Sequence, residues 1–93
     1  MNTYQQYAWQ TPCSSLSEKV ALLYCAHLAD ALTTNRVRLD PVRVTACLGI
    51  SASRVDAAIS ALHRNRVIYA QRWADSGAWT IRFPELHETR TAP

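Results

Sequence analysis

Apolar residues recur at helical spacing in three stretches of the chain. The first stretch, residues 16–32, is preceded by Ser15. Ser15 and Glu18 are the pair that forms a capping box at a helix start. The apolar positions of residues 16–32 repeat every three or four residues, which predicts one inward stripe. That stripe consists of Leu16, Val20, Leu23, Tyr24, His27, Leu28 and Ala31. Residues 41–48 form a short second helix, which starts after Asp40 and ends at Gly49.

A third helix is predicted over residues 52–65, with Ser51 as its N-cap. Its apolar side consists of Val55, Ala58, Ile59 and Leu62, and the opposite side is small or polar. In the short second helix the inward residues are Val44, Cys47 and Leu48, while Arg43 points away. A helix with a buried back and a small-residue front, placed directly after a glycine turn, indicates a helix-turn-helix.

Alternating polar and apolar residues predict strands in the rest of the chain. Residues 36–39 form a short strand with Val37 and Leu39 inward, and residues 67–73 and 78–83 form a hairpin around 74–77. If Trp73 pairs with Trp79, one hairpin face is apolar. The paired residues on that face are then Gln71 with Ile81 and Tyr69 with Phe83. The basic face carries Arg72, Thr80 and Arg82.

The predicted fold is mainly α with a small β-hairpin (α+β): three helices, a short strand and a two-stranded wing. A chain of 93 residues with 48% hydrophobic residues is large enough for one folded domain, placed here at residues 15–83. Residues 1–14 form an aromatic N-terminal arm and residues 84–93 a polar tail. Because isolated aromatic side chains would stay exposed, Tyr4, Tyr7 and Trp9 either dock on the chain's own core or contact a second subunit.

Several classes of function are disfavoured by what the sequence lacks. No apolar run approaches the roughly 18 residues of a membrane span, and residues 1–6 do not resemble a signal peptide, so the expected location is the cytoplasm. Three cysteines at unpaired spacing argue against disulfides and zinc, and Cys25 and Cys47 are interpreted as core residues. The histidines lack companion ligands or nucleophiles, and no glycine-rich phosphate loop is present. We therefore expect no catalytic residue, metal or cofactor.

Positive charge is concentrated in the middle of the chain. Residues 36–82 contain eight arginines and three aspartates, a sum of +5, whereas each flank sums to −1. Arginine presents a planar fork of donors that suits phosphate and guanine. Scattered arginines also simply keep a small domain in solution, so charge alone does not decide between a nucleic-acid partner and a solvated surface.

The amino-acid sequence of several stretches resembles that of a known family. Residues 16–23 and 27–30 look like the first helix of winged-helix domains in phage and plasmid replication-initiator and related regulatory proteins. Residues 48–51 and the apolar positions of 55–62 are similar to the turn and recognition helix of that family. Residues 66–68 stand where many members have Gly-Leu-Ile. The resemblance covers residues 15–83 and implies a winged helix-turn-helix with its recognition helix at about 52–65.

The resemblance implies binding to double-stranded DNA, in transcription regulation or replication initiation. Carried over by position, the base-facing candidates are Ala52, Ser53, Arg54, Asp56 and Ala57. The backbone candidates are Arg43, Ser51, Ser60, Arg64, Arg72, Asp75, Ser76 and Arg82. Arg54 alone could make a forked contact with guanine, whereas Asp56 repels phosphate unless it accepts from cytosine or pairs with an arginine.

Few base readers on one helix favour a homodimer that reads two half-sites. The alternative is a protein-binding winged helix of a phage or mobile element that engages a host protein complex. Small apolar residues on the front of 52–65 permit close docking of a protein while they offer DNA little to hold.

Overall fold

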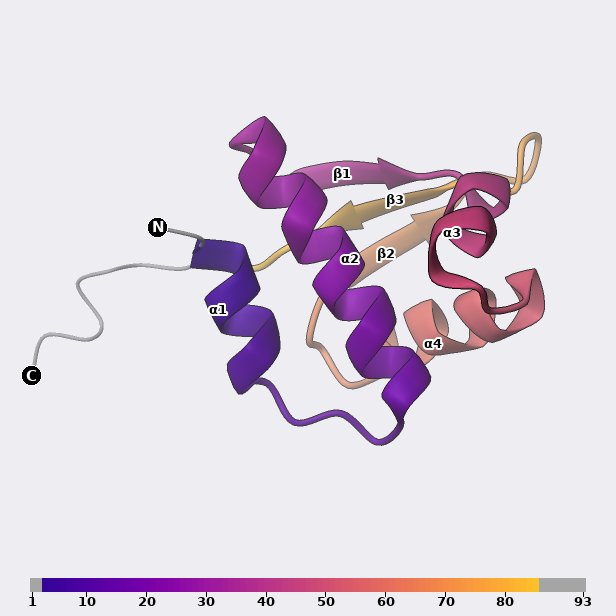
Figure 1. Cartoon of the computed structure of the whole chain (residues 1–93). Coiled ribbons are helices and arrows are strands. Elements are labelled where there is room, and N and C mark those ends of the chain that lie inside the picture. The colour runs from indigo at the N-terminus through magenta and orange to yellow at the C-terminus, as the bar shows by residue number, and fades with distance from the viewer. Residues whose placement is uncertain (1–2, 86–93) are drawn as a thin grey trace, which may run out of the picture.

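The computed structural model describes residues 3–85, and over this range the chain has four helices and a three-stranded antiparallel sheet (Figure 1). In chain order the elements are α1 (Thr3–Gln10), α2 (Leu16–Leu32), β1 (Arg36–Leu39), α3 (Pro41–Leu48), α4 (Ala52–Arg64), β2 (Tyr69–Arg72) and β3 (Trp79–Arg82). The α+β class is confirmed, but the prediction of three helices is wrong, because residues 3–10 of the supposed arm are helical. Most of the predicted polar tail, from residue 86 onward, lies outside the described residues.

The helix starts follow from the capping residues that the sequence provides. The Ser15 hydroxyl accepts from the Glu18 amide at 3.2 Å, and the Glu18 carboxylate accepts from the Ser14 amide at 3.2 Å. Asp40 accepts from the Val42 amide at 3.0 Å at the start of α3. These side chains satisfy amides that have no partner inside the helix, so each helix begins where the cap stands.

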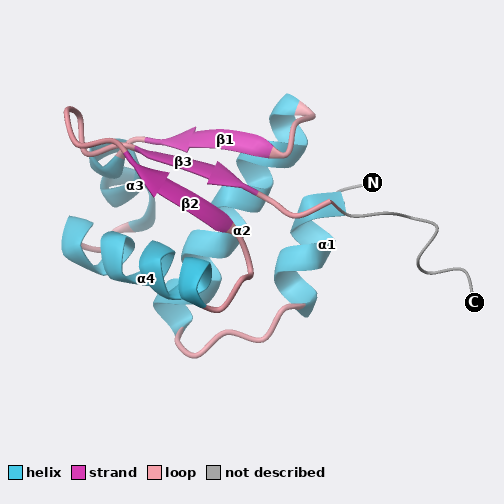
Figure 2. Ribbon diagram, turned by 180° about the vertical axis from the view of Figure 1, so that it is seen from behind, coloured by secondary structure: helices cyan, strands magenta, loops and turns pink. Residues whose placement is uncertain are grey.

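The sheet has strand order β1-β3-β2, so the last strand lies between the other two. Val37, Leu39, Trp79 and Ile81 are buried on its inner face, where they join the core residues of α2, α3 and α4. In the view from behind, the strands lie in front of α2 and no helix crosses in front of them (Figure 2). The outer face of the sheet is therefore not covered by a helix.

The predicted hairpin register is wrong by one residue. The pairs are Tyr69 with Arg82, Ala70 with Ile81, Gln71 with Thr80 and Arg72 with Trp79. The Gly77 amide donates to the Trp73 carbonyl at 2.7 Å, and the Trp73 amide donates to the Ala78 carbonyl at 2.8 Å. Because this turn closes over four residues, with Gly77 at φ +72°, Trp73 lies opposite Ala78 and not opposite Trp79. Tyr69, Gln71 and Trp73 consequently share the outer face with Thr80 and Arg82, and Arg72 does not.

The predicted inward stripe of α2 is only partly correct, because Leu23, Tyr24 and Leu28 are partly buried against the core but the fully buried positions are others. The buried residues of α2 are Glu18, Ala21, Leu22, Cys25, Ala26 and Ala29, whereas Leu16 is 78% exposed and His27 and Ala31 are exposed. The helix is packed on two sides, by α1 on one and by α4 and β1 on the other. Small alanines therefore face its neighbours at close range, and a single stripe of large residues does not describe the buried surface. Cys47, also predicted to be inward, is exposed, while Cys25 is buried as expected.

Helix α1 packs against α2 and the end of β3. Ala8 is fully buried, and the rings of Tyr4 and Tyr7 lie 5.0 and 6.0 Å from the Phe83 ring. The Tyr7 hydroxyl donates to the Val67 carbonyl at 2.6 Å. Tyr4 and Tyr7 thus contact the chain's own core, whereas Trp9 is 66% exposed. Among residues 3–85, no helix combines the length and the apolar character needed to cross a membrane.

Candidate nucleic-acid interface

Helix α4 is held against the core by the apolar side that the sequence predicts. Val55 and Ile59 are fully buried and Leu62 is 1% exposed. Gly49 lies at φ +71° in the left-handed region, where the lack of a Cβ removes the steric cost, and ends α3. Ser51 then caps α4 by accepting from the Arg54 amide at 3.3 Å. The turn thus fixes how α4 follows α3.

The front of α4 is the line of residues opposite its buried side. Ser53, Ala57, Ser60 and Arg64 follow one another at spacings of four, three and four, which places them on one helix face. Three of them are exposed and Ser60 is half-buried. The side chains of this surface are small at its N-terminal end, where Ser51 and Ala52 are also exposed. At its other end Arg64 makes the surface cationic.

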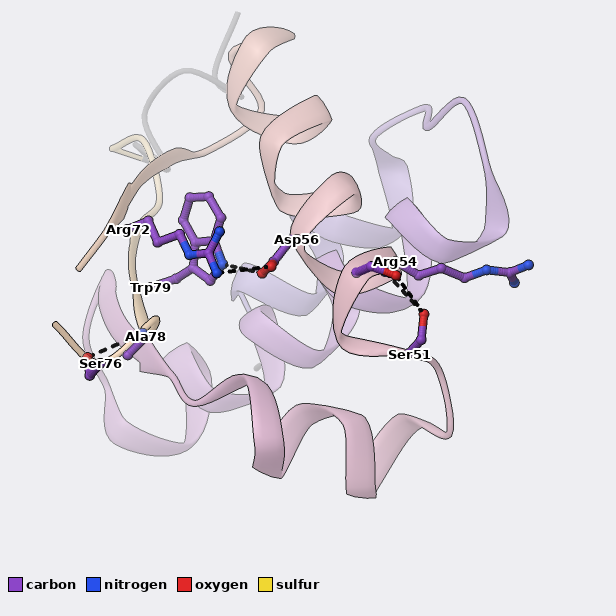
Figure 3. Close-up of polar contacts among 8 residues, drawn as sticks. Ser51, Arg54, Asp56, Arg72, Ser76, Ala78 and Trp79 are labelled. Carbon is purple, nitrogen blue, oxygen red and sulfur yellow. Dashed lines mark hydrogen bonds and ion pairs between the residues drawn. The ribbon is translucent and has the colours of Figure 1, made fainter. Parts of the chain in front are cut away.

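Two residues on the sheet side of α4 are used for contacts within the protein. Asp56 accepts from the Trp79 indole nitrogen at 2.9 Å, and its second oxygen lies 3.4 Å from an Arg72 guanidinium nitrogen (Figure 3). His63 accepts through Nδ1 from the Ala70 amide at 3.0 Å, so it covers part of the free edge of β2. Asp56, a candidate base reader, therefore points toward the hairpin and away from the front of α4.

Arg54 lies on the other side of α4, toward α2. It is exposed and its guanidinium extends away from the hairpin, as Figure 3 shows. It borders a shallow hollow of about 220 Å³ that Ser15, Glu18 and Ala57 also line. Arg54, the residue predicted to contact guanine, is therefore exposed, but it lies beside the front of α4 and not at its centre.

The hairpin separates the two arginines that the sequence placed together. Arg72 lies on the inner side, with its guanidinium 5.9 Å from the centre of the Trp79 ring and its side chain 52% exposed. Arg82 lies on the outer face, 4.5 Å above the Tyr69 ring. At the tip, the Ser76 hydroxyl accepts from the Ala78 amide at 3.3 Å. The one-residue register difference thus places Arg72 beside α4 and leaves Arg82 away from it.

The predicted site residues therefore do not form one surface. Ser51, Ala52, Ser53, Ala57, Ser60 and Arg64 share the exposed part of α4, with Arg54 at its side. Arg43 is exposed on α3. The outer face of the sheet, where Tyr69 and Trp73 lie among arginines, was not predicted from the sequence. The alternation in 36–39 was a usable signal for Arg36 and Arg38, but the wrong register assigned the two aromatic residues to the apolar side.

Compared with models of protein families, with curated proteins and with solved structures, the chain has no significant match. Residues 3–85 bring together no group of three or more His, Cys, Asp or Glu side chains that could hold a metal ion. Burial raises the pKa of the Cys25 thiol to about 12, which keeps it protonated as a packing residue.

Proposed function

We propose that residues 15–83 form a winged helix-turn-helix domain that binds double-stranded DNA, acting in transcription control or replication initiation. The element order from α2 to β3 and the strand order β1-β3-β2 support this reading. In it α4 is the recognition helix and the β2–β3 hairpin is the wing. Helix α1 is an addition at the N-terminal side. Such a function belongs in the cytoplasm, together with the DNA.

The observation that carries the proposal is the engagement of Asp56. It is the single acidic residue of α4, and its carboxylate is held by Trp79 and Arg72. The sequence left open whether this residue would repel phosphate. With both oxygens engaged on the sheet side, the front of α4 presents hydroxyls, methyl groups and Arg64 to a partner. A duplex then meets no carboxylate on that face.

The roles divide between base contact and phosphate contact. Small residues at positions 52, 53 and 57 let the backbone of α4 approach a base pair closely, and Arg54 supplies the forked donor for guanine. Ser51, Ser60, Arg43 and Arg64 are exposed or half-exposed and are assigned to phosphates. Because one helix carries a single strong base reader, we assign binding to a homodimer on paired half-sites.

The test starts with selection of bound duplexes from random DNA. We expect enrichment of a motif and a log–log slope of affinity against salt of about −3 to −4, for the four phosphates that Arg43 and Arg64 of the two protomers neutralise. Arg54→Ala should weaken binding to the selected duplex by about 5- to 150-fold, which corresponds to about 1–3 kcal/mol of base discrimination. Arg38→Ala, which removes an exposed arginine from the sheet, is the matched control and should change duplex affinity little. No enrichment together with no salt dependence would contradict the proposal.

A second candidate function is protein binding, favoured by an apolar groove between α2, β1 and α3. The groove measures about 480 Å³ and is lined by Tyr24, Leu28 and Leu39. Leu32, which also lines it, is 65% exposed, and Val42 on α3 is 78% exposed. A stoichiometric host partner that survives nuclease treatment, and that Leu32→Asp releases, would favour this function over DNA binding.

A further inference from the structure

The outer face of the sheet collects residues that the proposed function does not use. Side chains on this face alternate with the buried ones along each strand. They are Arg36 and Arg38 from β1, Thr80 and Arg82 from β3, and Tyr69 and Gln71 from β2, with Trp73 directly after β2. This is the face that no helix covers in Figure 2. We call these seven residues the outer sheet surface.

The outer sheet surface carries positive charge that no carboxylate among residues 3–85 pairs with. Arg36 and Arg82 are direct cross-strand partners, and like charges opposite each other destabilise a sheet. Neither they nor Arg38 form an ion pair with another residue between 3 and 85. None of the residues in β1, β2 and β3 is acidic. Three arginines held on one face without carboxylates indicate an anionic partner.

The same surface holds two aromatic rings in fixed positions. Tyr69 is 42% and Trp73 is 46% exposed. The Trp73 indole nitrogen donates to the Thr80 hydroxyl at 2.7 Å, and the Arg82 guanidinium lies 4.5 Å above the Tyr69 ring. Both rings line a shallow hollow of about 370 Å³, together with Arg36, Gln71, Thr80 and Arg82.

A second hollow adjoins the first at Tyr69, which lines both. It measures about 390 Å³ and lies between Tyr69, His63, Arg64 and Arg66. Tyr69 therefore stands between two hollows, each of which has arginine on its border. A polymer ligand in which planar groups alternate with negative charges matches this arrangement, in which aromatic rings alternate with arginines.

We propose that the outer sheet surface binds single-stranded nucleic acid. Bases stack on Trp73 and on the Tyr69 face that Arg82 does not cover, phosphates meet Arg36, Arg38 and Arg82, and the Gln71 amide reaches a base edge. Only unpaired bases expose the flat faces that exposed aromatic rings can stack on, whereas a duplex keeps them covered. A flat sheet face also cannot enter a groove as a helix does. This activity goes beyond the duplex binding proposed for α4 and uses a different face of the domain, which borders the front of α4 at Arg64.

The experiment measures fluorescence anisotropy of labelled dT12 and rU12 with the full chain at 50 mM salt. We expect binding, with a log–log salt slope of about −2 for three phosphates at −0.7 each. Tyr69→Leu and Trp73→Leu, which keep apolar volume but remove the rings, should each weaken binding by about 5- to 150-fold. Trp9→Leu removes a more exposed aromatic from α1 and is the control, with no expected change. Comparison of dU12 with rU12, which share the base and differ only in the 2′-hydroxyl, identifies the sugar.

Three results would overturn the proposal. They are absence of binding to both oligonucleotides, equal affinity of the ring variants and the wild type, and displacement by polyglutamate at the same charge concentration. Arg54→Ala separates this proposal from the previous one. It should lower affinity for the selected duplex and leave dT12 binding unchanged, while Tyr69→Leu and Trp73→Leu should do the reverse. Thermal unfolding of each variant establishes that the exposed positions were changed without loss of the fold.

Discussion

A single carboxylate, Asp56, joins α4 to both strands of the hairpin. Its contacts with Trp79 and Arg72 orient α4 against the sheet and keep a negative charge off the proposed duplex-binding front. The Trp79 side chain is 8% exposed, so its indole N–H depends on this acceptor. The ion pair with Arg72 is more exposed and contributes less.

Asp56→Ala should lower the free energy of unfolding by about 1–3 kcal/mol, because the buried indole N–H of Trp79 loses its partner. Asp56→Asn retains an acceptor oxygen and loses only the exposed ion pair, which is worth at most about 1 kcal/mol. Urea denaturation of the two variants checks this order. Equal losses would indicate that the ion pair, and not the indole hydrogen bond, holds α4 to the hairpin.

Arg66 stores conformational strain at the end of α4. It lies at φ +62°, its amide donates to the His63 carbonyl at 3.0 Å, and the Val67 amide donates to the Leu62 carbonyl at 3.0 Å. These bonds are those of a Schellman motif, in which the residue at this position is usually glycine. A left-handed conformation costs a residue with a Cβ about 1–2 kcal/mol.

Arg66→Gly should therefore raise the free energy of unfolding, by about 0.5–1 kcal/mol after the greater entropy of glycine in the unfolded chain is subtracted. Arg64→Gly is the control, because it removes the same charge two residues earlier, inside α4, where glycine costs about 1 kcal/mol. The two variants should shift the urea midpoint in opposite directions. A loss of stability in both would show that the Arg66 side chain contributes more than its backbone strain costs.

At the level of elements, α1 is attached by charged side chains at both of its ends. The two Asp30 carboxylate oxygens accept from the Tyr4 and Gln5 amides at 3.0 and 2.9 Å. At the other end the Lys19 ammonium donates to the carbonyls of Ala8, Trp9 and Thr11. Anions at a helix start and cations at a helix end complement the helix dipole. Both charges come from α2, so α1 is stabilised by the helix that it packs on.

Asp30→Ala should destabilise α1 by about 1–2 kcal/mol, because two helix-start amides lose their acceptor. Hydrogen exchange should become faster in α1 while the amides of α4 stay protected, since the change is local. Asp75→Ala, at the exposed hairpin tip, removes the same charge and serves as the control. Equal protection of α1 in both variants would show that Tyr4, Tyr7 and Ala8 hold this helix by packing alone.

Elements with local signals were predictable from the sequence. Asp40, Ser51, Gly49 and Gly77 stand where a cap or a positive φ angle is required, and each takes the expected role. The predicted inward residues of β1 and the predicted apolar side of α4 were also correct, because each of these elements packs on one side only.

Elements whose structure depends on tertiary partners were not predictable in this way. Helix α1 has few apolar residues, and its caps come from Asp30 and Lys19 of another helix. The hairpin register was decided by a hydrogen bond from Gly77 to Trp73 that alternation alone does not reveal. The helix end at Arg66 lacks the glycine that normally marks it. The prediction of the site was wrong for the same reason. The position of Arg72 and the exposure of Tyr69 both follow from the hairpin register.

At the level of the whole molecule, one core supports two exposed surfaces on different sides. The front of α4 points away from the core on the helical side, and the outer sheet surface points away from it across the sheet. The shorter dimensions of the molecule are 25 and 22 Å. Electrostatic interactions reach about 8 Å at 0.15 M ionic strength and about 30 Å at 0.01 M. Salt therefore decides whether ligands on the two surfaces affect each other.

At 0.15 M salt, saturation with dT12 should leave the affinity for the selected duplex within about twofold, because charges farther apart than about 8 Å are largely screened. At 0.01 M salt the two polyanions should repel each other through the domain, and the affinity for the duplex should fall. Titration of labelled duplex into protein with and without dT12, at both salt concentrations, measures this coupling. Trp73→Leu, which weakens the single-strand ligand alone, should abolish the coupling at low salt. Full displacement of the duplex at 0.15 M would instead mean that both ligands use one surface, and that the arginines of the sheet belong to the duplex site.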